Sequence, residues 1–299
     1  MSTPKHNPFQ GTGIALVTPF TASGAVDHVG LTRLVKHCIE GGVNFLVALG
    51  TTAESATLSK AEKGEVVQTI LDANAGRLPV VLGVGGNNTA EVCAALQQVP
   101  SGIDGILSVS PYYNKPSQEG IYQHFKAVSA ATDLPIILYN VPGRTSSNVT
   151  AETTLRVAQD CPNVVATKEA SGNMEQIMAI VKGAPAGFEV LSGDDNLTLP
   201  MIACGATGVI SVSGQGFPAI FSQMVQDARA SKMHVAQKGH YTLFEFTQLL
   251  FAEGNPGGIK SALEHLGVCE SHLRLPLWKV SDSLHAKMGE MVARIRSGN

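Results

Sequence analysis

Eight short apolar runs follow one another through the first two-thirds of the chain. Each is rich in Val, Ile or Leu, and none shows a clean alternation of apolar and polar positions. Continuous apolar runs of this length are typical of strands that are covered on both faces. The runs are GIALVTPF from residue 13, FLVALG from 45, VVLGVG from 80, GILSVSP from 105, PIILYN from 135, VVATKE from 164, FEVLSGDD from 188 and GVISVS from 208.

The segments between these runs have helical spacing. LTRLVKHCIEGG, residues 31–42, places its apolar residues at helical intervals before a Gly pair that can end a helix. Ser59 is a predicted N-cap with Glu62 three residues later, which is the capping-box pattern. Strand and helix thus alternate eight times, which predicts parallel strands joined by crossover helices. The α/β fold that fits best is a closed (β/α)8 TIM barrel; an open doubly wound sheet is the alternative.

The pattern changes near residue 220, after which only helix-like segments follow. We therefore expect a barrel in residues 1–219 that carries the active site. Residues 220–299 are predicted to form a C-terminal helical extension that includes the last barrel helix.

Composition narrows the class of protein. The net charge of −3 shows no basic excess that would favour nucleic acid or an anionic membrane. No apolar run reaches the roughly 18 residues of a membrane-spanning helix, and residues 1–13 lack the apolar segment of a signal peptide. The five cysteines are widely spaced without a CxxC pair, which predicts reduced thiols in a cytoplasmic protein.

Polar residues gather where the predicted strands end, and in a (β/α)8 barrel those ends carry the chemistry. They are Thr18, the segment 50–55, the segment 112–115, the segment 139–144, Lys168 with Glu169, and the segment 193–195.

Lys168 closes an apolar strand, an unusual place for a lysine. One interpretation is a solvated lysine at the sheet rim, paired with Glu169. The other is a Schiff-base lysine, because apolar walls disfavour its ammonium form and leave a free amine to attack a carbonyl. Tyr139 and Tyr113 at neighbouring strand ends, relayed through Thr51, would move the protons that this chemistry requires. Taken singly, each tyrosine also fits a core edge, and Thr51 and Thr52 also fit a simple turn.

Three further features allow two interpretations each. Arg144 after a Pro-Gly pair is either a grip for a substrate carboxylate or a solvated loop residue. Asp194 and Asp195 form a conceivable metal pair, but all nine histidines, His6 among them, fall outside the strand ends, which argues against a metal site. Residues 83–89, GVGGNNT, match no nucleotide-binding fingerprint and are predicted to be a tight turn.

The motifs GTTAES, SPYYNKPSQEG, YNVPGRT, VVATKEASGN, LSGDD and GVISV, in this order, resemble the dihydrodipicolinate synthase family. The resemblance runs from about residue 10 to 290. This family belongs to a wider group of pyruvate-dependent lyases of the class I aldolase type, which also contains N-acetylneuraminate lyase. It implies condensation of pyruvate with L-aspartate 4-semialdehyde in the diaminopimelate route to lysine. It implies no organic cofactor or metal, and a homotetramer built as a dimer of dimers.

The resemblance also implies roles for single residues. Lys168 matches the lysine that forms an imine with pyruvate, and Tyr139 matches the tyrosine that shuttles protons there. Thr51 and Tyr113 match the other members of the proton relay, with Tyr113 reaching into the neighbouring subunit. The backbone amides of Thr51 and Thr52 match the site that holds the pyruvate carboxylate. Arg144 matches the residue that holds the semialdehyde carboxylate. Gly193 and Ile210 match positions that line the imine pocket.

Two departures from the family pattern stand out. Ala53 replaces the second glycine of GTTGE, which would destabilise the turn by about 1 kcal/mol if the backbone had a positive φ there. The family's NPxPxK reads NPGGIK at residues 255–260, so one proline is missing and a small loop change is expected.

Many relatives are inhibited by lysine at a dimer-interface pocket. Lys60 and Lys63 replace histidines found in some lysine-sensitive members, and added positive charge repels a cationic ligand. We therefore expect weak or absent lysine inhibition. The matching positions are Ser55, Ala56, Lys60, Lys63, Asn87, Glu91 and Tyr112.

Two other functions compete with the synthase. A sister pyruvate lyase, such as N-acetylneuraminate lyase or a keto-sugar-acid aldolase, would share Lys168 and Tyr139, whereas Arg144 and Tyr113 favour the synthase. A catalytically silent paralogue that binds a keto acid is opposed by the presence of the full set of reactive residues.

Overall fold

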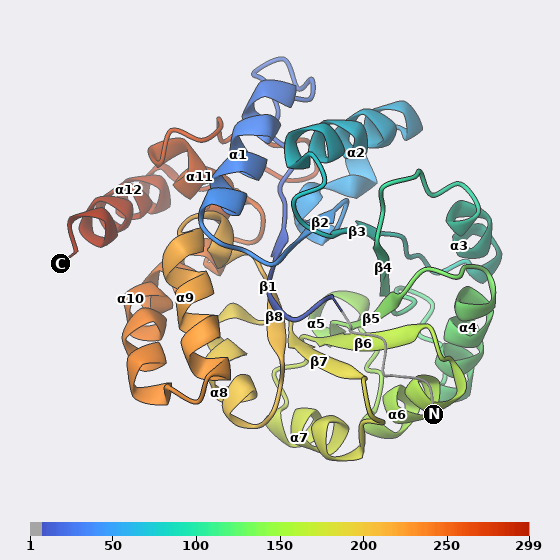
Figure 1. Ribbon diagram of the computed structural model, residues 1–299. Helices are drawn as coiled ribbons and strands as arrows, with labels where there is room; N and C mark the ends of the chain where they lie inside the picture. The colour runs from blue at the N-terminus through green and yellow to red at the C-terminus, as the bar shows by residue number, and fades with distance from the viewer. Residues whose placement is uncertain (1–7, 299) are drawn as a thin grey trace.

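Eight parallel strands close into one barrel in the computed structural model, which describes residues 8–298 (Figure 1). Each strand pairs with the next along the chain, and β8 pairs with β1. The predicted (β/α)8 barrel is therefore confirmed, and the β1–β8 pairing excludes the open sheet. His6 and the rest of residues 1–7 lie outside the described residues. The strands are β1 (Gly11–Ala15), β2 (Phe45–Ala48), β3 (Val80–Gly83), β4 (Gly105–Val109), β5 (Ile136–Asn140), β6 (Val164–Glu169), β7 (Glu189–Ser192) and β8 (Gly208–Ser211).

Helices surround the strands, as Figure 1 shows. The capping box predicted for α2 is present, because Ser59 Oγ accepts from the Glu62 amide and Glu62 Oε2 accepts from the Ser59 amide. The turn predicted at residues 83–89 joins β3 to α3. The helices are α1 (His28–Glu40), α2 (Lys60–Asn74), α3 (Thr89–Leu96), α4 (Gln118–Ala130), α5 (Pro142–Thr145), α6 (Ala151–Asp160), α7 (Met174–Gly183), α8 (Thr198–Ala203) and α9 (Pro218–Arg229).

Alternation along each strand separates two apolar clusters. One fills the layer between the strands and the helices. The other fills the barrel interior and includes Phe45, Ile137, Tyr139, Leu191 and Ile210. Both strand faces are covered, which explains why the strands appear in the sequence as continuous apolar runs.

The barrel closes between β1 and β8, where residue 208 has no room for a side chain. A Cβ placed on Gly208 would lie 2.2 Å from the Gly11 carbonyl oxygen, well inside van der Waals contact. The register pairs these two glycines directly across β1 and β8. Glycine at 208 is therefore required for the first and last strands to meet.

The extension consists of α10 (Met233–Phe251), α11 (Gly257–His265) and α12 (Asp282–Ser297), on one side of the barrel beside α9 (Figure 1). No strand follows β8 within the described chain, as predicted. The predicted boundary between barrel and extension, at residue 219, falls inside α9, and this helix packs against β1. The boundary itself stays a prediction.

The five cysteines, at positions 38, 93, 161, 204 and 269, all carry free thiols. Among the helices of residues 8–298, none combines the length and the apolar character that a bilayer crossing requires.

Candidate active site

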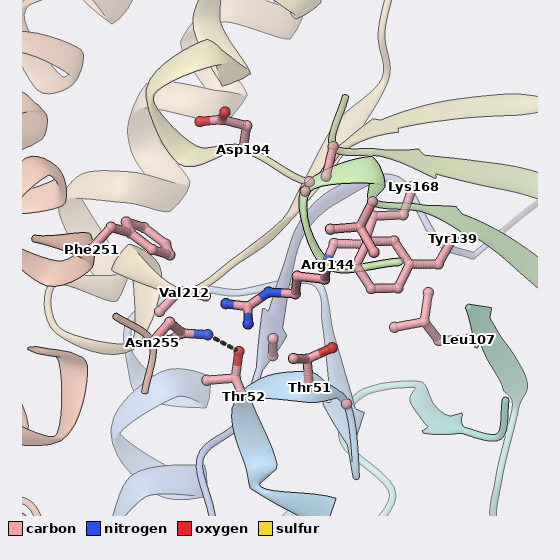
Figure 2. Close-up of a pocket in the computed structure, with 16 residues that line it drawn as sticks. Thr51, Thr52, Leu107, Tyr139, Arg144, Lys168, Asp194, Val212, Phe251 and Asn255 are labelled. Atoms are coloured by element: carbon pink, nitrogen blue, oxygen red, sulfur yellow. Dashed lines mark hydrogen bonds between the residues drawn. The ribbon is translucent and has the colours of Figure 1, made fainter. Parts of the chain in front are cut away.

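A cavity of about 410 Å³ opens at the C-terminal ends of the strands (Figure 2). Six of the eight residues predicted for catalysis and substrate binding line it, and they come from four different strand ends. The six are Thr51, Thr52, Tyr139, Arg144, Lys168 and Gly193.

Lys168 projects into this cavity from the end of β6 and is only 6% exposed. Its neighbour Glu169 faces the opposite side of the strand, so the two do not pair. The alternative of a solvated rim lysine paired with Glu169 is therefore wrong. The register places Lys168 directly beside Tyr139 of β5, and Nζ lies 4.2 Å from the centre of the tyrosine ring.

Small and apolar neighbours leave the Lys168 amine accessible. A Cβ on Gly193 would lie 3.1 Å from Lys168 Cε, so a side chain at position 193 would crowd the lysine. Throughout residues 8–298, no carboxylate lies within ion-pair distance of Lys168 Nζ. An amine held in a cavity without a fixed counter-charge is suited to attack a carbonyl carbon.

Glu169 supports the site from behind. Its buried carboxylate accepts from Asn140 Nδ2 at 3.0 and 3.1 Å, from the Ser171 amide at 2.9 Å and from Gln176 Nε2 at 3.2 Å. Burial raises the pKa of this carboxyl, and these hydrogen bonds act in the opposite direction. Asn140 also donates to Asn148 Oδ1, so the same network holds the loop that follows α5.

Thr51 and Thr52 belong to a turn of 3-10 helix, η1 (Thr51–Ala53), which begins three residues after the end of β2. Within the described part of the chain, neither amide donates to another protein group, as expected for the start of a helical turn. Two free amides at the rim of a cavity can bind a carboxylate. The turn is fixed by a hydrogen bond from Asn255 Nδ2 to Thr52 Oγ1 at 2.9 Å, drawn in Figure 2, and by one from Thr18 Oγ1 to the Ala53 carbonyl at 2.7 Å.

Ala53 does not strain this turn. The left-handed residues here are Leu49, at φ 54°, and Glu54, at φ 53°, and Ala53 is not among the positive-φ positions. The condition for a destabilising Gly-to-Ala change is therefore not met.

Arg144 lies on α5, one turn after β5, and its side chain is exposed. Figure 2 shows its guanidinium reaching toward Thr52 and Asn255, on the other side of the cavity from Lys168 and Tyr139. The cavity thus has an amine at one end and a guanidinium at the other, which suits a substrate with both a carbonyl and a carboxylate.

Two predicted residues do not line the cavity. Ile210 is 1% exposed and packs in the interior cluster with Tyr139, beneath the cavity rather than on its surface. Tyr113 is 86% exposed with φ 72°, so within one chain its hydroxyl does not join the other predicted relay residues.

Phe251, Asn255 and Val212 line the cavity but were not predicted. Phe251 and Asn255 come from the C-terminal extension, and the conspicuous NPGGIK segment was the one signal that could have indicated Asn255.

In the NPGGIK segment, a Cβ on Gly258 would lie 2.2 Å from the Leu250 carbonyl oxygen. A proline there would not fit, since α11 starts directly against the end of α10. The expected small loop change relative to the family stays a prediction.

Asp194 and Asp195 serve different purposes. Asp195 Oδ2 accepts from the amides of Val212 and Ser213 at 3.1 and 2.9 Å, so this buried carboxylate supports the end of β8. Asp194 lines the cavity, but its carboxylate turns away from Lys168 and Arg144 (Figure 2). Burial raises the pKa of both carboxyls.

Over residues 8–298, the structure contains no cluster of three or more His, Cys, Asp or Glu side chains that could hold a metal.

Some of the predicted regulatory positions line a second cavity, of about 600 Å³, which shares Thr51 and Tyr139 with the first. Four of the seven line it: Ser55, Ala56, Lys63 and Tyr112. The other three lie outside its lining: Lys60 donates to Gln98, Asn87 donates to the Tyr112 carbonyl, and Glu91 is exposed on α3.

The model of the dihydrodipicolinate synthetase family matches residues 8–295. The chain belongs to this family. The match covers the barrel and the extension together, so the cavity with Lys168, the helix that contributes Phe251 and the loop that contributes Asn255 all lie within the matched residues.

Individual relatives agree with the family. The chain is 53% identical to a 4-hydroxy-tetrahydrodipicolinate synthase of Flavobacterium psychrophilum over 94% of its own length and 96% of the relative's. It resembles the dihydrodipicolinate synthase of Acinetobacter baumannii complexed with pyruvate, with a TM-score of 0.93, 36% identity and coverage of 96% and 99% of the two chains. It resembles the Cyanidioschyzon merolae enzyme with lysine bound equally well, with a TM-score of 0.92, 38% identity and coverage of 96% and 98%. These relatives favour the synthase over the sister lyases.

Proposed function

We propose that Lys168 forms an imine with pyruvate and that the derived enamine attacks L-aspartate 4-semialdehyde. The chain is a carbon–carbon lyase with the activity of a 4-hydroxy-tetrahydrodipicolinate synthase, in the diaminopimelate route to lysine. The observation that carries the proposed mechanism is the position of Lys168, which is buried beside Tyr139 in a cavity with free amides and a guanidinium on its other walls.

The proposed reaction balances without an organic cofactor or a metal. The Lys168 amine attacks the ketone carbon of pyruvate, and the ketone oxygen leaves as water. The protonated imine loses a methyl proton to become an enamine, whose carbon bonds to the aldehyde carbon while the aldehyde oxygen becomes a hydroxyl. The amino group of the semialdehyde then attacks the imine carbon, which closes the ring and releases Lys168.

The other residues are assigned roles that fit their positions. Tyr139 transfers protons at the imine, because its ring lies against Lys168 Nζ. The Thr51 and Thr52 amides hold the pyruvate carboxylate, and Arg144 holds the carboxylate of the semialdehyde. Gly193 gives the lysine chain room, and Ile210 supports Tyr139 from the barrel interior.

Tyr113 supports an oligomeric enzyme. Tyr113 is 86% exposed and has a left-handed backbone conformation, so its hydroxyl does not reach the cavity of its own chain. In an oligomer it could instead complete the proton relay of a neighbouring subunit, together with Thr51. We therefore infer that the working form contains at least a dimer, and the resemblance to the family supports a homotetramer built as a dimer of dimers. The five free thiols support a cytoplasmic location.

Trapping the imine tests this function. The protein mixed with pyruvate and reduced with borohydride is expected to gain one reduced pyruvate adduct per chain, which peptide mass spectrometry should locate on Lys168. A sample treated with borohydride alone is the control. An adduct on another lysine, or none, would remove Lys168 from the mechanism.

Inhibition by lysine is expected to be weak or absent. The cavity of about 600 Å³ has the Lys63 ammonium in its lining, which repels a cationic amino acid. Initial rates measured across a lysine series should show half-inhibition at millimolar concentration or above. The variant Lys63→His should become more sensitive, whereas an inhibition constant well below millimolar for the unmodified enzyme would show that the added charge does not control this site.

A further inference from the structure

A buried ion pair joins the C-terminal extension to the catalytic turn. Lys260 Nζ on α11 lies 2.5 Å from Glu54 Oε1, and both side chains are completely buried. Lys260 Nζ also donates to the His272 carbonyl at 2.8 Å, and Glu54 Oε2 accepts from the Arg274 amide at 3.0 Å. The ring of Phe20 contacts both cations, with its centre 4.3 Å from Lys260 Nζ and 4.4 Å from Arg274 Cζ.

Glu54 is the residue that immediately follows the Thr51–Ala53 turn. It has the left-handed backbone conformation, at φ 53°, which is uncommon for a residue other than glycine and persists only where its surroundings enforce it. The bonds from Lys260 and Arg274 provide that enforcement. Together with the bond from Asn255 to Thr52, they attach both sides of the turn to the extension.

Stability alone does not account for this pair. Removing two charges from water is costly, and replacing a buried ion pair by apolar side chains is often neutral or stabilising. Burial lowers the pKa of Lys260, which reflects that cost, while the Glu54 carboxylate acts in the opposite direction. What the pair provides instead is a fixed geometry between segments that are 206 residues apart in the sequence.

We propose that Glu54 and Lys260 are positioning residues for the pyruvate carboxylate site. They hold the backbone amides of Thr51 and Thr52 at the distance from Lys168 Nζ that pyruvate requires, although neither touches the substrate. This inference rests on the proposed function, since it assumes that these amides bind pyruvate. It assigns the C-terminal extension a direct part in setting the affinity for the first substrate.

The double variant Glu54→Gln with Lys260→Met tests the inference. It leaves no unpaired buried charge, and the carbonyl oxygen of the new glutamine can still accept from the Arg274 amide, so we expect it to fold. The KM for pyruvate should rise by about 10- to 100-fold, because a misplaced carboxylate site weakens capture of the substrate. The kcat at saturating pyruvate and the KM for the semialdehyde should change much less.

Val157→Ala is the matched control. Val157 is fully buried on α6 and lines neither cavity, so its truncation lowers the melting temperature without touching the turn. Its KM for pyruvate should equal that of the unmodified enzyme. A folded double variant with an unchanged KM for pyruvate would overturn the inference, as would an equal rise in the Val157→Ala control.

If the double variant does not fold, Asn255→Ala provides the second test. This change removes the bond to Thr52 and shortens a side chain that lines the cavity, and it should raise the KM for pyruvate more than the KM for the semialdehyde. An unchanged KM would then overturn the inference. The imine trap on the unmodified enzyme is independent of these variants, so failure of the inference and failure of the proposed function can be told apart.

Discussion

Replacement of Lys168 by alanine is expected to reduce kcat/KM by more than about 1,000-fold, because no other lysine among the described residues lines this cavity to supply the amine that forms the imine. The fold should persist, since Lys168 has no ion-pair partner to lose within the described chain. Steady-state condensation rates give the loss of activity, and the thermal unfolding midpoint shows whether the variant is folded.

Lys168→Arg separates charge from nucleophilicity. It retains a cation at the same strand end but has no free amine, so it should be as inactive as the alanine variant. Neither variant should gain mass after pyruvate and borohydride. Substantial activity in a folded Lys168→Ala variant would show that the reaction does not pass through a lysine imine.

Tyr139→Phe is expected to lower kcat by about 100- to 10,000-fold, the range typical of a lost general acid or base. The substitution keeps the ring that packs 4.2 Å from Lys168 Nζ and removes only the hydroxyl. Because packing is preserved, the pyruvate adduct should still form, more slowly, while turnover falls. Rapid-mixing measurement of adduct formation alongside steady-state rates separates these two effects.

Tyr122→Phe is a control for loss of a tyrosine hydroxyl. Tyr122 is buried on α4, and its hydroxyl donates to Asp160 at 2.8 Å, outside the active-site cavity. This variant should lose some stability but keep its kcat. If Tyr139→Phe also retained a kcat close to that of the unmodified enzyme, another group would have to carry the proton.

The barrel could be predicted from the sequence because both faces of every strand are covered, so each strand appears as an uninterrupted apolar run. The prediction failed in detail at the end of β1. GIALVTPF suggests a strand that continues to Thr18, but β1 ends at Ala15. Beyond that point the Val17 amide donates to the side chain of Gln215 instead of to a neighbouring strand. Gln215 lies 198 residues from Val17 in the sequence, so the local pattern of residues could not indicate that it replaces a strand partner.

The site was predictable to the extent that its residues lie at strand ends. Lys168, Tyr139 and the Thr51–Thr52 turn could be placed together because parallel strands bring their carboxyl ends to one side of the barrel. Phe251 and Asn255 reach the cavity from an extension whose position depends on packing rather than on strand order. The ion pair of Glu54 with Lys260 is unpredictable for the same reason, since each residue alone has the appearance of a surface charge.

The pairing of β1 with β8, where Gly11 meets Gly208, limits when the barrel can close during synthesis of the protein. One edge of β1 pairs with β2, which follows shortly in the sequence, but its other edge waits for β8, near residue 208. Any sheet that the earlier strands form during translation must therefore be open, with exposed edge strands at both ends, a form prone to pairing with other nascent chains. The ring can close only once β8, about two-thirds of the way along the polypeptide, has left the ribosome.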